Sequence, residues 1–139
     1  MKSINKRRSL IGLPVVWSII TTILLSLPGS MFQGDGTLFN IPNADKIAHL
    51  ILFSGLVFLW IFFDYRKNNL KSGALEWFVV VLVSSYGIVM EYVQFYFIPK
   101  RSFDKGDIVA DVVGSLIGYL FAQWIISWHG RKKSSLKYL

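Results

Sequence analysis

Long apolar blocks separated by short polar segments dominate the hydrophobic pattern of this 139-residue chain. Four such blocks span residues 9–27, 47–63, 74–98 and 108–128. Each is close to the ~20 residues that an α-helix needs to cross the ~30 Å hydrocarbon core of a bilayer. A soluble helix would interrupt its apolar residues with a polar face. The pattern therefore predicts an all-α protein, a four-span transmembrane helix bundle forming a single domain over residues 1–139.

Basic residues gather at one side of this predicted bundle and give the chain most of its net charge of +7. They precede the first block or follow the second and fourth blocks: Lys2, Lys6, Arg7, Arg8, Arg66, Lys67, Lys71, Arg131, Lys132, Lys133 and Lys137. Loop 28–44, on the other side, has no Lys or Arg, but loop 99–106 on that side is an exception, with Lys100, Arg101 and Lys105. Because cytoplasmic segments carry the excess of Lys and Arg, both termini are expected inside, the N-in/C-in topology. This placement favours anionic lipid headgroups over nucleic acid as the partner of the basic tails.

Small residues recur at every fourth position of the last block, at Ala110, Gly114, Gly118 and Ala122. Such a ridge lets helix backbones approach closely in lipid. The favoured interpretation is packing against a neighbouring helix of the same chain. Homo-oligomerisation through Gly114 and Gly118 is the alternative.

Polar residues from three predicted spans fall at the outer end of the bundle, because consecutive spans run antiparallel. The group consists of Asp45, Lys46, His49, Glu91, Gln94, Arg101, Asp104, Asp107 and Asp111. Ionised side chains near hydrocarbon cost at least a few kcal/mol, so they usually face each other or a water-filled pocket. Their convergence therefore predicts either a functional site or a buried network that holds the helices in register.

Three functional constructions fit this group. Glu91 or His49 would serve as a general base, with Asp107 and Asp111 orienting His49 or holding a cation. A divalent cation would bind to the oxygen and nitrogen donors of His49, Glu91, Asp107 and Asp111. A metal site with cysteine ligands is excluded, because the chain has no cysteine. An anion would bind between Lys46 and Arg101.

Simpler interpretations remain for several of these residues. Asp104 and Asp107 precede or begin a predicted helix, where a carboxylate accepts hydrogen bonds from free N–H groups. Glu76 is expected to be a charge in the first turn of its span, at the opposite end of the bundle. No other polar group is expected at that end, which argues against a proton-coupled transporter.

At these positions the chain resembles the VanZ-like family of small bacterial membrane proteins. The likeness rests on Asp45-Lys46-x-x-His49, Glu91-x-x-Gln94, Arg101-x-x-Asp104-x-x-Asp107 and the glycines Gly114 and Gly118. Asp111 departs from the pattern, where asparagine is expected. The resemblance implies a multi-pass protein of the bacterial cytoplasmic membrane and a link to the cell envelope. The family takes its name from a member associated with resistance to the glycopeptide antibiotic teicoplanin.

The leading hypothesis is an outward-facing polar pocket that binds, and in its catalytic form modifies, a lipid-linked or amphiphilic envelope substrate. The expected partners are membrane lipid and a lipid-linked glycan or amphiphilic antibiotic. Glu91, His49 and Asp107 are the catalytic candidates, and substrate binding is assigned to Lys46, Arg101, Gln94, Asp111, Asp45 and Asp104. The alternative is a non-catalytic membrane scaffold or partner subunit in which the polar group is structural.

Overall fold

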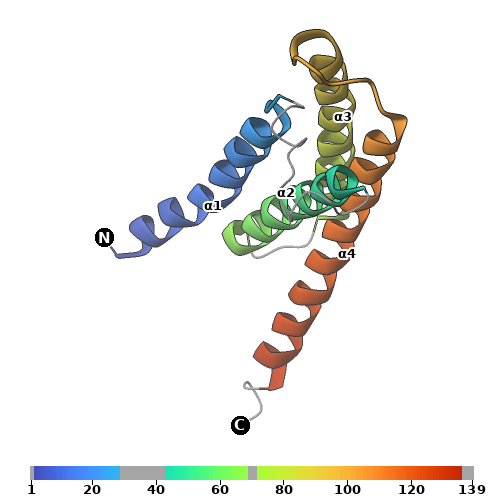
Figure 1. Cartoon of the computed structure of the whole chain (residues 1–139). Helices are drawn as coiled ribbons and strands as arrows, with labels where there is room; N and C mark the ends of the chain where they lie inside the picture. Colours follow the sequence, from blue (N-terminus) through green and yellow to red (C-terminus); the bar gives the residue numbers. More distant parts are fainter. Residues whose placement is uncertain (1, 29–42, 69–71, 136–139) are drawn as a thin grey trace.

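The computed structural model describes residues 2–28, 43–68 and 72–135, and within them it contains four α-helices and no strand (Figure 1). The helices are α1 (Lys2–Leu25), α2 (Ala44–Asn68), α3 (Gly73–Phe97) and α4 (Lys105–Ser135). The predicted all-α class is confirmed. Each predicted block lies almost wholly within one helix, and α2, α3 and α4 begin up to three residues earlier than predicted.

Three of these helices are long and apolar enough to cross a membrane, namely α2, α3 and residues Lys105–Arg131 of α4. In α1 the apolar part is shorter and covers Ile11–Leu25. Large apolar side chains cover the outside of the bundle: Val81 is 61% exposed and Leu120 is 64% exposed. So much outward apolar surface is unusual in water and suits contact with lipid chains.

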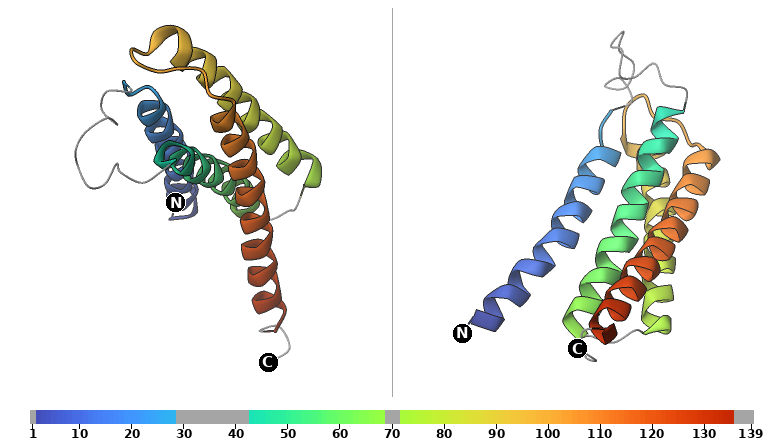
Figure 2. Two further views of the ribbon diagram at one scale, coloured as in Figure 1. Left: turned by 45° about the vertical axis from the view of Figure 1, so that its right-hand side comes forward. Right: turned by 90° about the horizontal axis from the view of Figure 1, so that it is seen from below.

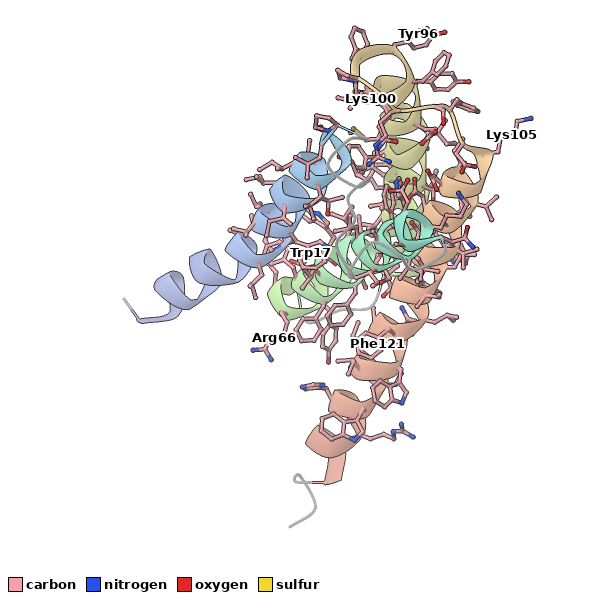
Figure 3. All side chains as sticks on the ribbon, viewed as in Figure 1. Trp17, Arg66, Tyr96, Lys100, Lys105 and Phe121 are labelled. Atoms are coloured by element: carbon pink, nitrogen blue, oxygen red, sulfur yellow. The ribbon has the colours of Figure 1, made fainter. Side chains whose placement is uncertain are left out.

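Successive helices run in opposite directions, so the bundle has two distinct ends (Figure 2). The first residues of α1 and the last residues of α4 lie at the same end, as an even number of crossings requires. Lys100 and Lys105 lie at the other end, and Arg66 lies far from them near the end of α2 (Figure 3). Which end faces the cytoplasm stays a prediction, and most of loop 28–44 lies outside the described residues.

Helix α2 occupies the centre of the bundle and packs against each of the other three helices. Phe53, Val57 and Ile61, spaced four residues apart on α2, are at most 2% exposed and form the middle of the apolar core. Residues four apart lie on one face of a helix, so this stripe gives α2 a continuous apolar side. Its most extensive contact is with α4.

Glycines of α4 make this contact close. A Cβ atom at Gly114 would lie 2.5 Å from the backbone carbonyl oxygen of Leu50, and one at Gly118 would collide with the carbonyl oxygen of Ser54. Only glycine lets the two backbones approach so closely. The interpretation that this ridge packs within the chain is confirmed, and homo-oligomerisation through the same glycines stays a prediction.

The connection between α3 and α4 turns at Pro99. Ile98 is extended, with φ −103° and ψ 119°, as expected for a residue that precedes proline. The helix therefore ends at Phe97, and residues 98–104 cross to the start of α4. This crossing brings Arg101 and Asp104 over the end of the bundle.

Replacing Gly118 with alanine should lower the free energy of unfolding by about 1–3 kcal/mol, because the added methyl group overpacks the α2–α4 contact. Gly114→Ala should act in the same direction. The measurement is denaturant unfolding of the purified chain in detergent, followed by tryptophan fluorescence.

Gly130→Ala is the matched control, because a Cβ atom there meets nothing within 4 Å. This control should be neutral or stabilising, since alanine is the better helix former. Equal effects at Gly118 and Gly130 would contradict the close approach of α2 and α4.

Candidate functional site

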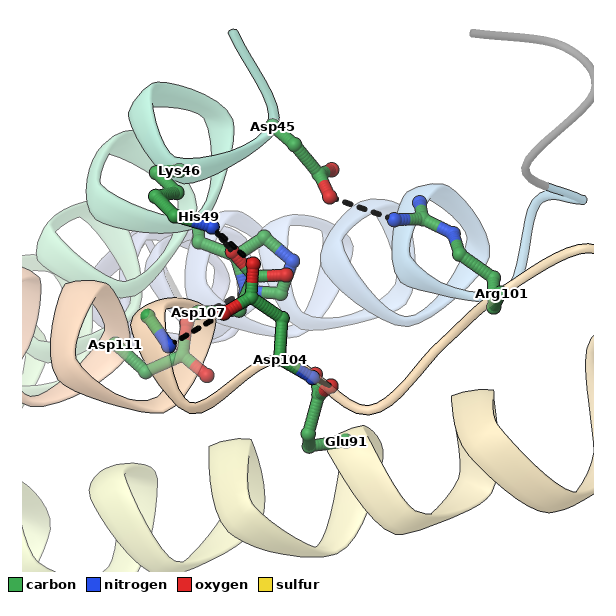
Figure 4. A network of polar contacts seen from close by, with 9 residues as sticks. Asp45, Lys46, His49, Glu91, Arg101, Asp104, Asp107 and Asp111 are labelled. Carbon is green, nitrogen blue, oxygen red and sulfur yellow. Dashed lines mark hydrogen bonds and ion pairs between the residues drawn. The ribbon is translucent and has the colours of Figure 1, made fainter. Parts of the chain in front are cut away.

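Eight polar side chains meet at the end of the bundle where α2 and α4 begin and α3 ends (Figure 4). We call this group the polar cluster. Its members are Asp45, Lys46, His49, Glu91, Arg101, Asp104, Asp107 and Asp111. Of the nine residues that the sequence singled out, the structure thus brings eight together.

His49 and Asp111 form the most deeply buried pair of the cluster. Nδ1 of His49 lies 2.8 Å from a carboxylate oxygen of Asp111, and both side chains are 2% exposed. The imidazole also stacks on Phe53, with ring centroids 6.2 Å apart and ring planes 5° from parallel. Phe53 follows His49 by four residues, so helical spacing alone places the two rings on one face. These contacts fix the orientation of the imidazole.

Two cations of the cluster are paired with carboxylates. Nζ of Lys46 contacts Asp104 and lies 3.0 Å from Oδ1 of Asp107. Arg101 donates from Nη1 to Oδ2 of Asp45 at 2.8 Å. Both positive charges therefore face protein carboxylates, which makes an anion site between Lys46 and Arg101 the least supported of the three constructions.

Asp104 caps the N-terminus of α4, as one interpretation of the sequence had it. Its Oδ1 accepts a hydrogen bond of 2.7 Å from the backbone N–H of Gly106, the second residue of the helix. The ammonium group of Lys46, and then this N–H, hold the pKa of the Asp104 carboxyl below its ordinary value of 3.8. Asp107 lies in the first turn of α4 and pairs with Lys46.

Glu91 joins α3 to the same helix start. Its Oε1 accepts a hydrogen bond of 2.5 Å from the backbone N–H of Asp104. Its Oε2 is buried and has no hydrogen-bond partner among the described residues. Nε2 of His49 is likewise buried and unpartnered there. His49 and Glu91 thus each contribute a buried polar atom that the hydrogen bonds of the cluster do not satisfy.

Gln94, which the sequence placed with the substrate-binding residues, forms a hydrogen bond outside the cluster. Its Nε2 donates to the backbone carbonyl of Leu25 at 2.8 Å. Leu25 is the last residue of α1, where carbonyl groups lack partners within the helix. Gln94 therefore ties the end of α1 to α3.

Glu76 lies in the first turn of α3, as expected, but its side chain is buried rather than exposed. It is 8% exposed and accepts a hydrogen bond of 2.7 Å from Nε2 of Gln123 in α4. The other half of the bundle therefore does contain a partly buried polar pair. No pattern within one helix could reveal it, because the partner lies 47 residues further along the chain.

An apolar groove lined by α1, α2 and α3 is separated from the cluster by the ring of Phe53. Its volume is about 280 Å³ and its lining includes Leu56, Trp60, Leu82, Val83 and Tyr86, with the hydroxyl groups of Ser18 and Thr22. Phe53 connects the two sites, since it stacks on His49 on one side and on Tyr86, 6.0 Å away, on the other.

Comparison with known proteins identifies one family. The model of the family described as VanZ/LLP1 matches residues 4–126. A protein of Schizosaccharomyces pombe, described as "Uncharacterized protein C11E3.10", is 27% identical over 121 residues, covering 86% of this chain and 69% of its own length. No solved structure matches the chain. Because this relative is from a yeast, the expected bacterial location stays a prediction.

Removing the carboxyl group of Asp111 should destabilise the chain more than neutralising it. Asp111→Ala leaves the buried Nδ1–H of His49 without an acceptor, which costs about 1–3 kcal/mol. Asp111→Asn keeps an acceptor oxygen and should cost less. Denaturant unfolding in detergent measures both, with Asp64→Ala as a control at a partly exposed position of α2. Equal losses for Ala and Asn would contradict the assigned hydrogen bond.

The ion pair of Asp104 should make stability depend on pH in the acid range. Because folding lowers the pKa of Asp104, its carboxylate stabilises the fold at pH values above 3.8. This contribution disappears as the pH falls below that value. Asp104→Asn keeps the capping oxygen but loses the charge. With a chelator present, the variant should be about 0.2–1 kcal/mol less stable than the native chain at pH 7. The difference should vanish at low pH, and a constant difference would contradict the assignment.

Proposed function

The chain belongs to the VanZ/LLP1 family, and from this premise we propose that it binds a lipid-linked or amphiphilic envelope molecule at the polar cluster. In this proposal it is a four-span protein of the bacterial cytoplasmic membrane, with both termini inside and the cluster at the outer face. The single observation that supports it best is the convergence of polar groups from three helices beside an apolar groove.

The groove suits the hydrocarbon chain of such a ligand. It is open on one side and lies between helices whose outward faces are apolar, so a lipid chain would enter it from the bilayer without crossing water. Its hydroxyl groups are engaged within the protein. Ser18 and Thr22 donate to backbone carbonyls of α1 at 2.8 Å, and the Tyr86 hydroxyl lies 3.0 Å from that of Thr22. The groove therefore presents a largely apolar surface.

The cluster suits a hydroxyl-rich or charged headgroup. Asp45 and Asp104 are its more exposed carboxylates, with side chains 39% and 46% exposed, and a carboxylate readily accepts hydrogen bonds from sugar hydroxyl groups. A headgroup phosphate would compete with these carboxylates for Lys46 and Arg101. A lipid-linked glycan fits both descriptions, and an amphiphilic antibiotic is a second ligand of the same class.

A catalytic form of the proposal uses the two unpartnered atoms. Nε2 of His49 or Oε2 of Glu91 would accept a proton from the substrate, since neither has a hydrogen-bond partner among the described residues. Asp111 orients His49 through its contact with Nδ1. Asp107 is the third candidate, and its carboxylate is paired with Lys46.

The alternative function is that of a non-catalytic scaffold or partner subunit. It is favoured by the pairing of Lys46 and Arg101 with carboxylates, since such pairs also hold helices in register. Under this alternative, His49→Ala and Glu91→Ala variants should lose folded protein from the membrane. Under the ligand-binding proposal they should lose binding while folded protein stays at normal levels.

A complete amphiphile should stabilise the purified chain more than either of its parts. The probes are a polyprenyl-phosphoryl sugar, the polyprenol alone and the sugar phosphate alone, each added to the chain in detergent at matched concentration. Binding at 100 times the Kd adds about 2.7 kcal/mol to the stability of the folded state, which a thermal unfolding scan resolves.

Leu82→Trp and Val81→Trp separate the groove from the general surface. Both positions are exposed on α3, but only Leu82 lines the groove. Leu82→Trp should reduce the shift produced by the complete amphiphile, whereas Val81→Trp should leave it unchanged. Equal shifts in both variants, or a full shift with the polyprenol alone, would count against the proposed mode of binding.

A further inference from the structure

We propose that Asp45, His49 and Asp107 form a binding site for a divalent transition-metal ion of the Zn²⁺ or Mn²⁺ type. Each of the three residues offers one ligand atom, and these atoms all lie within 4.8 Å of one another. Two carboxylate oxygens with one imidazole nitrogen are a donor set that suits such ions, and hard ions such as Ca²⁺ prefer oxygen alone. This site is distinct from the predicted set of His49, Glu91, Asp107 and Asp111.

The state of His49 gives the proposal its strongest support. Nε2 is buried within a side chain that is 2% exposed, and it has no hydrogen-bond partner among the described residues. A buried imidazole nitrogen left unpaired costs free energy. Figure 4 shows the imidazole in the middle of the cluster, with its other nitrogen turned to Asp111. A metal ion bound to Nε2 would remove this cost.

Asp111 supplies the support that a metal-binding histidine usually has. In such sites the second ring nitrogen donates its N–H to a carboxylate, which fixes the tautomer and turns the free lone pair toward the metal. The 2.8 Å contact between Nδ1 of His49 and Asp111 has this arrangement. Stacking on Phe53 holds the ring in the same orientation. Asp111 is therefore a positioning residue rather than a ligand.

The charge of the cluster also favours a bound cation. Its five carboxyl groups belong to Asp45, Glu91, Asp104, Asp107 and Asp111, and only Lys46 and Arg101 carry permanent positive charge. Each of the two cations engages one oxygen of a proposed ligand, Oδ1 of Asp107 and Oδ2 of Asp45. The second oxygen of each carboxylate can therefore face the metal. With three protein ligands, the remaining coordination positions are left to water or to a headgroup oxygen.

Binding of Mn²⁺ to the tag-free, full-length chain in detergent tests the site. Electron paramagnetic resonance measures the free ion, and pulsed measurements detect the coupling between bound Mn²⁺ and an imidazole ¹⁴N nucleus. The native chain should bind one Mn²⁺ and show this coupling. Asp45→Asn and Asp107→Asn should weaken binding, and Asp111→Ala should weaken it about 10–100-fold, as loss of a supporting carboxylate does in other metal sites.

The two histidines of the chain provide a matched control, because His129 lies exposed near the end of α4, far along the helix from Asp107. His49→Gln should abolish the ¹⁴N coupling, whereas His129→Gln should leave both the coupling and the affinity unchanged. Circular dichroism confirms that each variant is folded. Binding without ¹⁴N coupling, coupling that depends on His129, or no binding by the folded native chain would each overturn the proposal.

The outcome is independent of the proposed lipid ligand, since Mn²⁺ is added without lipid. If Mn²⁺ binds as described and no amphiphile stabilises the chain, the metal site stands and the proposed function fails. If the amphiphile binds equally well with a chelator present and Mn²⁺ does not bind, the proposed function stands and the metal site fails.

Discussion

The cost of placing carboxylates beside hydrocarbon is the constraint on which the rest of this structure depends. Asp107, Asp111 and Glu91 belong to helices that are otherwise long enough and apolar enough to cross a membrane. Lipid cannot solvate an ionised carboxylate, so each must find a partner in the protein. The beginnings of α2 and α4 and the end of α3 are therefore held together, and the eight residues of the polar cluster result from that requirement.

Close packing of α2 against α4 allows these polar side chains to come together. Gly114 and Gly118 let the backbones of α2 and α4 approach until a single methyl group would collide with a carbonyl oxygen. Since Asp111 lies one turn before Gly114, the same approach brings its carboxylate to His49 on α2. The buried His49–Asp111 pair thus depends on the glycine ridge, although the ridge contains no polar side chain.

Several features of the cluster followed from the sequence, and others did not. The antiparallel order of the spans predicted that Asp45, Glu91 and Asp107 lie at the same end of the bundle. The hydrogen bond of Gln94 to Leu25 was not foreseen, because an unpaired carbonyl at the end of α1 is not visible as a residue type. The contact between Glu76 and Gln123 was missed because its partners lie on different helices.

The sequence by itself determined the helices, their order and the list of polar residues that need partners, because length, hydropathy and helical period act along one helix at a time. Only the tertiary structure decided which of these polar residues pair with one another. It paired Lys46 with Asp104 and Asp107, and Asp111 with Nδ1 of His49. It also brought a ring nitrogen of His49 within 4.8 Å of carboxylate oxygens of Asp45 and Asp107. These choices depend on the rotation of each helix about its axis, which packing between helices sets and no single-helix pattern contains.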